Sequence, residues 1–377
     1  MTAAWGLASD PEHRVAMEVL LRGPISRTEL ARRLDLSQPS LSRLTKPLLR
    51  RGLLIEVGRA DSDGAGRPAI LLDVERSSHH FAGIKVTGHH VRGALVDFRG
   101  EVVAVAETGL EVTEPARVAE EVAAVVHELD GHAVSAGLGV SVGGQVTGGS
   151  TVRHAGFLGW DRVDFAALVE ARIARPTIVE NDVAALLSAE HWFGIGREVE
   201  TFLVITVGAG VGFGAVVHDR AIEGEDFGLG MVTHWPLDCN GPLCPEGHRG
   251  CAQAMLTDAA ILSQAATALG RELSWEEFID VAKQGQPAAR RLLEEAASAL
   301  GRFVGQAANL FLPEAVVLAG EGVEIATVAR PHLETAMATQ RHPAASAPRI
   351  VVREPETVLW SRGAAIPALQ AFARRER

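Results

Sequence analysis

Thiol and imidazole side chains gather in one short stretch of the sequence, HWPLDCNGPLCPEGHRGC, which runs from residue 234 to residue 251. It holds all three cysteines of the chain, Cys239, Cys244 and Cys251, together with His234 and His248. Thiolates and imidazoles are ligands that Zn²⁺ prefers, usually as a set of four in a structural site. A disulfide is the other chemistry open to these residues, but an odd cysteine count in a chain without a secretory signal disfavours it. The stretch therefore indicates a metal site or free thiols.

The composition is that of a globular protein which, at 377 residues, is long enough for two or three domains. Hydrophobic residues make up 47% of the chain and charged residues 22%. The sequence has no run of about eighteen apolar residues, so we expect no transmembrane helix. Its first residues, MTAAWGLASDPEHR, lack the basic and apolar regions of a secretory signal. We therefore expect a cytoplasmic location and no membrane partner.

The net charge of −11 is unevenly distributed along the chain. Residues 1–78 hold 12 Lys and Arg against 10 Asp and Glu, whereas residues 79–377 hold 24 against 37. The acidic part would be repelled by a nucleic acid or an anionic membrane. Only the N-terminal segment is therefore suited to approach a phosphate backbone.

Three short helices are predicted in the N-terminal segment. The first covers residues 11–22 and shows an apolar face at helical spacing. The second begins with Ser26 and Glu29, whose spacing is that of a capping box. The third follows Ser37, a suitable N-cap, and contains Pro47, which predicts a kink or an early end.

A β-hairpin is predicted after these helices, with a loop rich in Gly and Asp that contains Arg67. Three short helices and a hairpin resemble a winged helix-turn-helix, in which the third helix enters the major groove of DNA. Polar and basic side chains early in that helix would meet base edges and phosphates. The expected DNA contacts are Gln38, Ser40, Ser42, Arg43, Lys46 and Arg67. The alternative is a packing or dimerisation module in which Arg43 is merely solvated.

From residue 79 onward apolar strands alternate with helical stretches, so we expect an α/β fold, in two lobes with a cleft between them. Three successive strands are predicted over residues 81–107, with turns at Gly88 and Gly100. A later strand carries alternating glycines at positions 208, 210, 212 and 214. Backbone there can approach a phosphate or a sugar, or simply form a tight hairpin. Both interpretations stay open.

In its motifs and element order the chain resembles the ROK family, which comprises sugar kinases and transcriptional repressors with an N-terminal winged helix. The motifs are GLGVSVGGQVTGG at 137–149, VENDVAALLSAEHWFG at 179–194, VGAGVGFGAVV at 207–217, LDCNGPLCPEGHRGCAQAML at 237–256 and VLAGEGV at 317–323. The resemblance covers nearly the whole chain. It implies a winged helix-turn-helix followed by a two-lobed sugar-kinase-like module of the actin and hexokinase type.

The resemblance implies roles for Asn181 and Asp182. In family kinases the corresponding Asp is the general base for the sugar hydroxyl, and the Asn binds the sugar. A carboxylate at the end of a strand can take a hydroxyl proton as a phosphoryl group arrives. Asp182 also directly precedes an apolar helix, so it can equally serve as a helix cap.

Three departures from the family pattern argue against kinase activity. Lys85 stands where the family has the Asp of its phosphate loop, which reverses the charge needed beside Mg²⁺. Met231 and Gln253 stand where the family has glutamates, and methionine cannot replace a carboxylate acceptor. The candidate ligand-binding residues that remain are Asn181, Asp182, His234 and Gln253.

The family also binds zinc through one histidine and three cysteines. The matching residues here are His234, Cys244 and Cys251, but Glu246 replaces the middle cysteine. His248 is the favoured fourth ligand, because imidazole is a better partner for thiolates around zinc than a carboxylate is. Glu246 and Cys239 are the other candidates, and a chain that has lost zinc and keeps reduced thiols is the alternative to all of them.

The expected organisation is a DNA-binding domain over residues 1–78 and a ROK-type module over residues 79–377. In that module residues 79–182 and 356–377 would form the first lobe, and residues 183–355 the second.

We expect a DNA-binding transcriptional regulator that acts as a repressor and senses a sugar or sugar phosphate. It would be a homodimer or a higher homo-oligomer and bind a roughly palindromic operator. The alternatives are an active ATP-dependent sugar kinase with an accessory DNA-binding domain, and a scaffold that binds a protein partner. Lys85 argues for the regulator over the kinase, because phosphoryl transfer requires a Mg²⁺ ion that the Lys85 ammonium would repel.

Overall fold

The computed structural model describes residues 10–60, 69–355 and 357–374. They fall into two compact units, Met1–Arg197 with Trp360–Arg377, and Glu198–Leu359. The division therefore comes after the helix that begins at Asp182, whereas the sequence places the lobe boundary before it.

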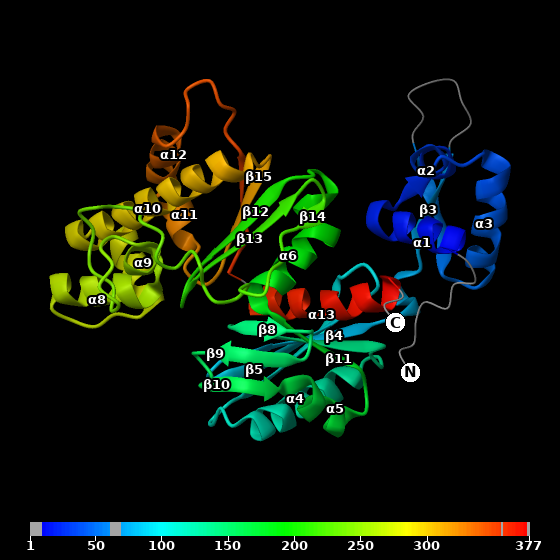
Figure 1. Cartoon of the computed structure of the whole chain (residues 1–377), viewed down its shortest axis with the longest axis horizontal. Coiled ribbons are helices and arrows are strands. Elements are labelled where there is room, and N and C mark those ends of the chain that lie inside the picture. The colour runs from blue at the N-terminus through cyan, green and yellow to red at the C-terminus, as the bar shows by residue number, and fades with distance from the viewer. Residues whose placement is uncertain (1–9, 61–68, 356, 375–377) are drawn as a thin grey trace. The chain divides into compact units, whose positions relative to one another are not determined.

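The first unit begins with three helices and a three-stranded sheet (Figure 1). The elements are α1 (Asp10–Arg22), β1 (Ile25–Ser26), α2 (Arg27–Leu34), α3 (Gln38–Arg50), β2 (Leu54–Ala60) and β3 (Ala69–Val74). The sheet order is β1-β3-β2, and all pairs are antiparallel. The predicted three helices and hairpin are thus confirmed, and we call residues 10–60 with 69–74 the winged helix.

Local sequence explains where these helices begin and end. The Ser26 hydroxyl accepts a hydrogen bond from the Glu29 N–H, and Ser37 does the same for Ser40, as N-caps should. The Glu29 carboxylate accepts hydrogen bonds from Arg32 and Arg33. Pro47 lies inside α3 without ending it, so the prediction of an early end is wrong. Pro47 is close to the C-terminus of the helix, where few further backbone hydrogen bonds are at stake.

A five-stranded sheet follows in the same unit, in the order β11-β7-β4-β5-β6. Its strands are β4 (Phe81–Val86), β5 (His90–Val96), β6 (Val102–Gly109), β7 (Gly137–Val142) and β11 (Thr177–Asn181). β4, β7 and β11 run parallel, and β5 and β6 pair antiparallel beside them. A small second sheet contains β8 (Gln145–Thr147), β9 (Thr151–Ala155) and β10 (Trp160–Asp164).

Helices cover both faces of the five-stranded sheet (Figure 1). α4 (Pro115–Asp130) and α5 (Phe165–Ile173) bury their apolar residues on one face, and α13 (Thr357–Arg374) lies on the other beside α6 (Asp182–Phe193). Gly83 and Gly139 make the contact with α13 possible. A Cβ at either position would collide with α13 backbone, at Ser361 and Ala364 respectively.

The second unit has its own five-stranded sheet, in the order β14-β13-β12-β15-β16. Its strands are β12 (Phe202–Val207), β13 (Val211–Val217), β14 (Arg220–Ala221), β15 (Ala315–Ala319) and β16 (Arg349–Val352). Its helices are α7 (Ala252–Leu256), α8 (Asp258–Leu269), α9 (Trp275–Lys283), α10 (Pro287–Phe311), α11 (Glu324–Val328) and α12 (Arg330–Thr339).

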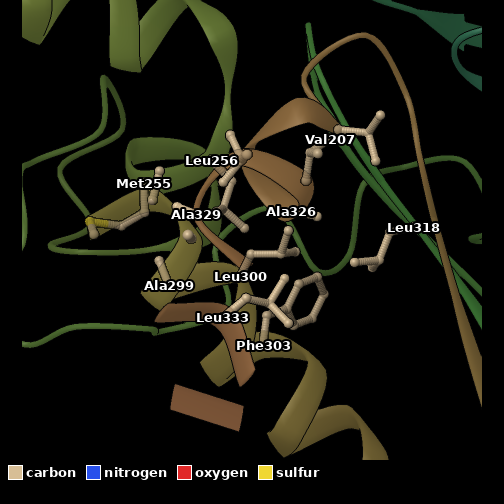
Figure 2. Close-up of a cluster of buried hydrophobic side chains, with 14 of the residues drawn as sticks. Val207, Met255, Leu256, Ala299, Leu300, Phe303, Leu318, Ala326, Ala329 and Leu333 are labelled. Carbon is tan, nitrogen blue, oxygen red and sulfur yellow. The ribbon is translucent and has the colours of Figure 1, made fainter. Parts of the chain in front are cut away.

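The core of this unit forms around α10, a helix of 25 residues. Leu300 and Phe303 of α10 lie with Leu333 of α12, Leu318 of β15 and Val207 of β12 in one buried cluster (Figure 2). Apolar residues three and four apart form this buried face of α10, while Arg290 and Arg291 face outward. Among the described residues, no helix combines the length and apolarity needed to cross a bilayer.

Candidate functional site

The first candidate site is the exposed face of α3. Leu41, Thr45 and Leu48 are buried, which leaves the opposite side of the helix outward. The predicted DNA contacts Gln38, Arg43 and Lys46 are exposed on α3, and Ser40 and Ser42 are half-buried. Neither Arg43 nor Lys46 has an ion-pair partner within residues 10–60, 69–355 and 357–374, so both charges are available to a phosphate backbone. Arg67 lies outside the described residues.

The second candidate site lies at the carboxyl ends of the parallel strands β4, β7 and β11. Val86, Val142 and Asn181 stand side by side there. This edge of a parallel sheet is where α/β proteins usually bind ligands. We call Lys85, Ser141, Asn181 and Asp182 the strand-end site.

Lys85 and Asp182 form an ion pair within this site. The Lys85 ammonium donates a hydrogen bond to Asp182 Oδ2, and the two side chains are only 11% and 18% exposed. Lys85 Nζ also lies 5.3 Å from the ring centroid of Trp360 on α13. The carboxylate that the sequence suggests as a general base is therefore already neutralised by an internal cation.

Asn181 is the N-cap of α6. Its Oδ1 accepts hydrogen bonds from the N–H groups of Val183 and Ala184, at 2.9 and 3.2 Å, and its Nδ2 donates to the Gly144 carbonyl at 2.8 Å. Only 4% of Asn181 is exposed. Its amide thus orients the strand end and the helix that carries Asp182.

Two residues that the sequence did not single out complete the strand-end site. The Ser141 hydroxyl is fully buried and has no hydrogen-bond partner among the described residues. Phe157 is 67% exposed. A Cβ added at Gly143 would lie 3.7 Å from the Phe157 ring and 3.4 Å from Asp182 Oδ2, so this glycine leaves space between an aromatic ring and a carboxylate. An aromatic residue in the glycine-rich stretch HAGFLGW was the available sequence signal.

The third candidate site is a cluster of His234, Cys244 and Cys251 in the second unit. The three ligand atoms lie within 4.8 Å of one another, and His234 Nδ1 is 3.8 Å from each sulfur. Both cysteines are buried. In tetrahedral zinc sites the bond lengths place nitrogen and sulfur ligands about 3.5 Å apart, so the donor set and the spacing fit this metal.

Two more side chains of the same loop lie near the cluster. His248 Nδ1 is 3.5 Å from Cys244 Sγ, and the His248 and His234 rings are 4.2 Å apart. A hydrogen bond from the Cys244 thiol lowers the pKa of Glu246. Cys239 is exposed and forms no disulfide. His248 and Glu246 are therefore both within reach of the cluster.

Gln253 follows the cluster on α7. Its N–H donates to the Thr233 carbonyl at 2.8 Å, which fixes the start of the helix to the loop before His234. Gln253 Oε1 is buried and has no partner among the described residues, so it can accept a hydrogen bond from a ligand. Met231 is 73% exposed.

The glycine turn between β12 and β13 faces two carboxyl groups. A Cβ at Gly208 would lie 2.6 Å from Glu321 Oε2, and the Asp258 N–H donates a hydrogen bond to the Gly208 carbonyl at 3.0 Å. Burial, and then the charge of Glu321, raise the pKa of Asp258 to about 7. The negative charge of Glu321 at this turn disfavours the approach of a phosphate.

A cavity of about 390 Å³ lies beside the loop that runs from His234 to Cys251, and is bordered by α8, α10 and α12. Several charged residues of its lining are paired, as Arg302 is with Asp238 and Arg291 with Glu295. It contains none of the candidate site residues.

Comparison with protein families gives two matches. Residues 81–368 match the model of the ROK family, and residues 8–67 match that of the MarR family. The chain is 24% identical over 312 residues to the xylose repressor of Bacillus subtilis, covering 81% of both chains. It is 28% identical over 335 residues to the DNA-binding transcriptional dual regulator NagC of Escherichia coli, covering 84% of this chain and 82% of NagC.

Solved structures show the same fold. A ROK family transcriptional regulator, described as a homologue of the E. coli MLC protein, matches 96% of both chains with a TM-score of 0.79 and 22% identity. A ROK family glucokinase from Streptomyces griseus, solved with glucose and AMPPNP, matches 77% of this chain and 99% of its own with a TM-score of 0.67 and 23% identity. The mixed α/β fold with a sugar-kinase-like module is thus confirmed.

Proposed function

The chain belongs to the ROK family, and from that premise we propose that it is a DNA-binding repressor whose kinase-like module senses a sugar and no longer transfers phosphate. The relatives named above as repressor and transcriptional regulator support the DNA-binding role. The Lys85–Asp182 ion pair carries the proposal that phosphoryl transfer is lost.

This ion pair removes two requirements of phosphoryl transfer. A general base must be free to take the hydroxyl proton, and Mg²⁺ must lie near the transferred phosphoryl group. The Lys85 ammonium binds the only carboxylate of the strand-end site and repels a divalent cation. In the second unit, Asp258 and Glu321 lie at the glycine turn between β12 and β13. These acidic groups also argue against a bound nucleotide phosphate and so against kinase activity.

A sugar remains a suitable ligand for the module. Asp182 accepts hydroxyl hydrogens, the Phe157 ring offers an apolar face for a pyranose, and Gly143 leaves room between them. The second unit by itself offers another candidate acceptor, Gln253 Oε1, which has no hydrogen-bond partner among the described residues. Xylose, for which the B. subtilis repressor is named, is the first sugar to test, together with N-acetylglucosamine, for which a repressor of Escherichia coli O157:H7 that is 28% identical to this chain is named.

We assign the cluster of His and Cys side chains to the binding of one structural zinc ion. Its ligands would be His234, Cys244, Cys251 and His248. When bound, zinc would close the loop that carries these ligands and brace the start of α7. Backbone hydrogen bonds from Leu237 and Asp238 to the Gly250 carbonyl already bring the ends of that loop together.

DNA binding is assigned to the exposed face of α3, with Gln38, Arg43 and Lys46 outward and Ser40 and Ser42 beside them. One winged helix covers a single half-site, so we expect a homodimer on a roughly palindromic operator, with half-sites one helical turn or a multiple apart.

The experiment that tests the function is a thermal-shift screen of the full chain against D-xylose, N-acetylglucosamine and their phosphates, with ATP and Mg²⁺ present. ADP release is read in the same wells. We expect at least one sugar to raise the melting temperature without ADP. ADP release with any sugar would overturn the loss of kinase activity, and no shift with any sugar would remove the sugar sensor from the proposal.

A further inference from the structure

We propose that Arg99 and Arg197 form a joint that fixes the winged helix to the sheet of the sugar module, and that α13 links the Lys85–Asp182 pair to this joint. The inference rests on the proposed function and deepens it, because it names the route by which a ligand would alter DNA binding.

The joint is built on the C-terminal end of α1. The guanidinium of Arg99, from the turn after β5, donates hydrogen bonds to the carbonyls of Val19 and Leu20. It also pairs with the Asp73 carboxylate of β3. Only 4% of the Arg99 side chain is exposed. The last carbonyls of a helix lack partners within it and form the negative end of its dipole, so a buried cation there is well placed.

Arg197, at the end of the 3₁₀ helix Ile195–Arg197, makes a second contact at the same place. It donates to the Gly23 carbonyl at 2.7 Å, and Arg22 donates back to the Arg197 carbonyl at 3.1 Å. The contact requires glycine at position 23, because a Cβ there would lie 2.5 Å from the guanidinium of Arg99. Two separate segments of the sugar module therefore hold the same helix end.

An apolar cluster extends this contact to α13. Phe98, next to Arg99 in sequence, packs against Phe372 of α13 with ring centroids 5.9 Å apart, and Phe81 of β4 lies 5.4 Å from the same ring. Val19 and Leu20 of α1 belong to the same buried cluster. Breaking the joint would thus expose apolar surface as well as a charge.

α13 spans the distance from this cluster to the ligand site. Trp360, near its start, lies over Lys85, and Phe372, near its end, lies in the ring cluster. Twelve residues of helix separate them, which is about 18 Å. The helix backbone packs directly on Gly83 and Gly139, so the middle of α13 is held against the sheet between these two ends. A change at the Lys85–Asp182 pair that displaces Trp360 would therefore be felt at Phe372 and α1.

The joint is tested by hydrogen exchange with mass spectrometry on the full chain, which needs neither operator nor effector. The variant is the double substitution Asp73→Leu with Arg99→Met, which removes both charges together. The control is Asp130→Leu with Arg175→Met, a somewhat more exposed ion pair of the same unit, which is not in contact with α1. We expect amides of residues 15–26 to exchange at least about tenfold faster in the joint variant and at the wild-type rate in the control.

Two comparisons keep this test decisive. Peptides from the second unit report any general loss of stability, and Arg99→Lys, which keeps the charge but not the planar fork, gives a milder variant. Wild-type exchange in residues 15–26 of both joint variants would overturn the joint.

The link through α13 is tested by perturbing the ligand site itself. Lys85→Met with Asp182→Asn removes that ion pair without a ligand. In the wild-type background we expect this double variant to change the amide exchange rates of residues 15–26 by about threefold or more. In the background of Asp73→Leu with Arg99→Met we expect it to cause no further change. Equal effects in both backgrounds would overturn the link. A failed sugar screen leaves these results unchanged, so the two proposals fail independently.

Discussion

At the scale of single residues, a charge reversal decides how the module is interpreted. Lys85 takes a position that the sequence could flag only as unsuitable for Mg²⁺. The structure adds that the Lys85 ammonium binds Asp182, and that Trp360 lies over the same ammonium. No spacing in the sequence predicts the contact with Trp360, because nearly the whole module separates the two residues along the chain. Such contacts depend on how elements pack rather than on local propensity.

The fourth zinc ligand is a prediction at this scale. We expect the purified chain to hold about one zinc ion, and His248→Ala to release it to a chelator at a lower concentration than wild type, because three ligands leave the tetrahedron open. Zinc release is followed with a colorimetric metal indicator. Cys239→Ser is the control, since that thiol is exposed and outside the cluster. If Glu246→Gln releases zinc and His248→Ala does not, the carboxylate is the ligand instead.

Asp258 predicts a pH dependence of stability. Its pKa is raised from 3.8 to about 7, so between about pH 4 and pH 7 the folded chain keeps a proton that the unfolded chain has lost. The free energy of unfolding therefore falls as the pH rises through this window. We expect wild type to lose on the order of 1–2 kcal/mol more than Asp258→Asn between these limits, measured by urea unfolding.

Asp280→Asn, which changes an exposed aspartate of α9, is the control and should follow the wild-type curve. A wild-type pH slope retained in Asp258→Asn would contradict the prediction.

At the scale of elements, most of the secondary structure could be predicted from the sequence. The winged helix and the strands β4, β5, β6, β7 and β11 follow from apolar periodicity and turn residues, which are local signals. Half of the predicted capping box is present: Ser26 caps α2, while the Glu29 carboxylate pairs with two arginines one turn later. The sequence does not predict the small sheet β8-β9-β10, because its short strands lie in a glycine-rich stretch with weak alternation.

The exposed face of α3 gives a prediction at this scale. We expect Arg43→Ala to weaken binding to a random-sequence 30-bp duplex and to lower the slope of log K against log salt by about 1, because one phosphate contact is lost. Fluorescence anisotropy measures both quantities. Arg330→Ala, an exposed arginine on α12, is the control. An unchanged salt slope in Arg43→Ala would show that Arg43 does not contact the phosphate backbone.

At the scale of the whole molecule, the ROK family explains why a winged helix precedes a sugar-kinase-like module. The structure adds the contacts that hold the winged helix within the first unit. The sequence suggests a DNA-binding domain that ends near residue 78, a division that stays a prediction. The buried pair of Asp73 and Arg99 was not foreseen, although an aspartate within the apolar run ILLDV was a possible signal. Pairing partners 26 positions apart along the chain cannot be read from periodicity.

The continuous apolar cluster from α1 to α13 has a consequence for how such proteins evolve. Modules joined by a simple linker can be exchanged between genes, because neither depends on the surface of the other. A foreign winged helix grafted at residue 78 would have to supply its own partner for Arg99, and a buried unpaired charge costs about 3–5 kcal/mol. Descent with both parts together, rather than recombination between them, is the history that this surface favours.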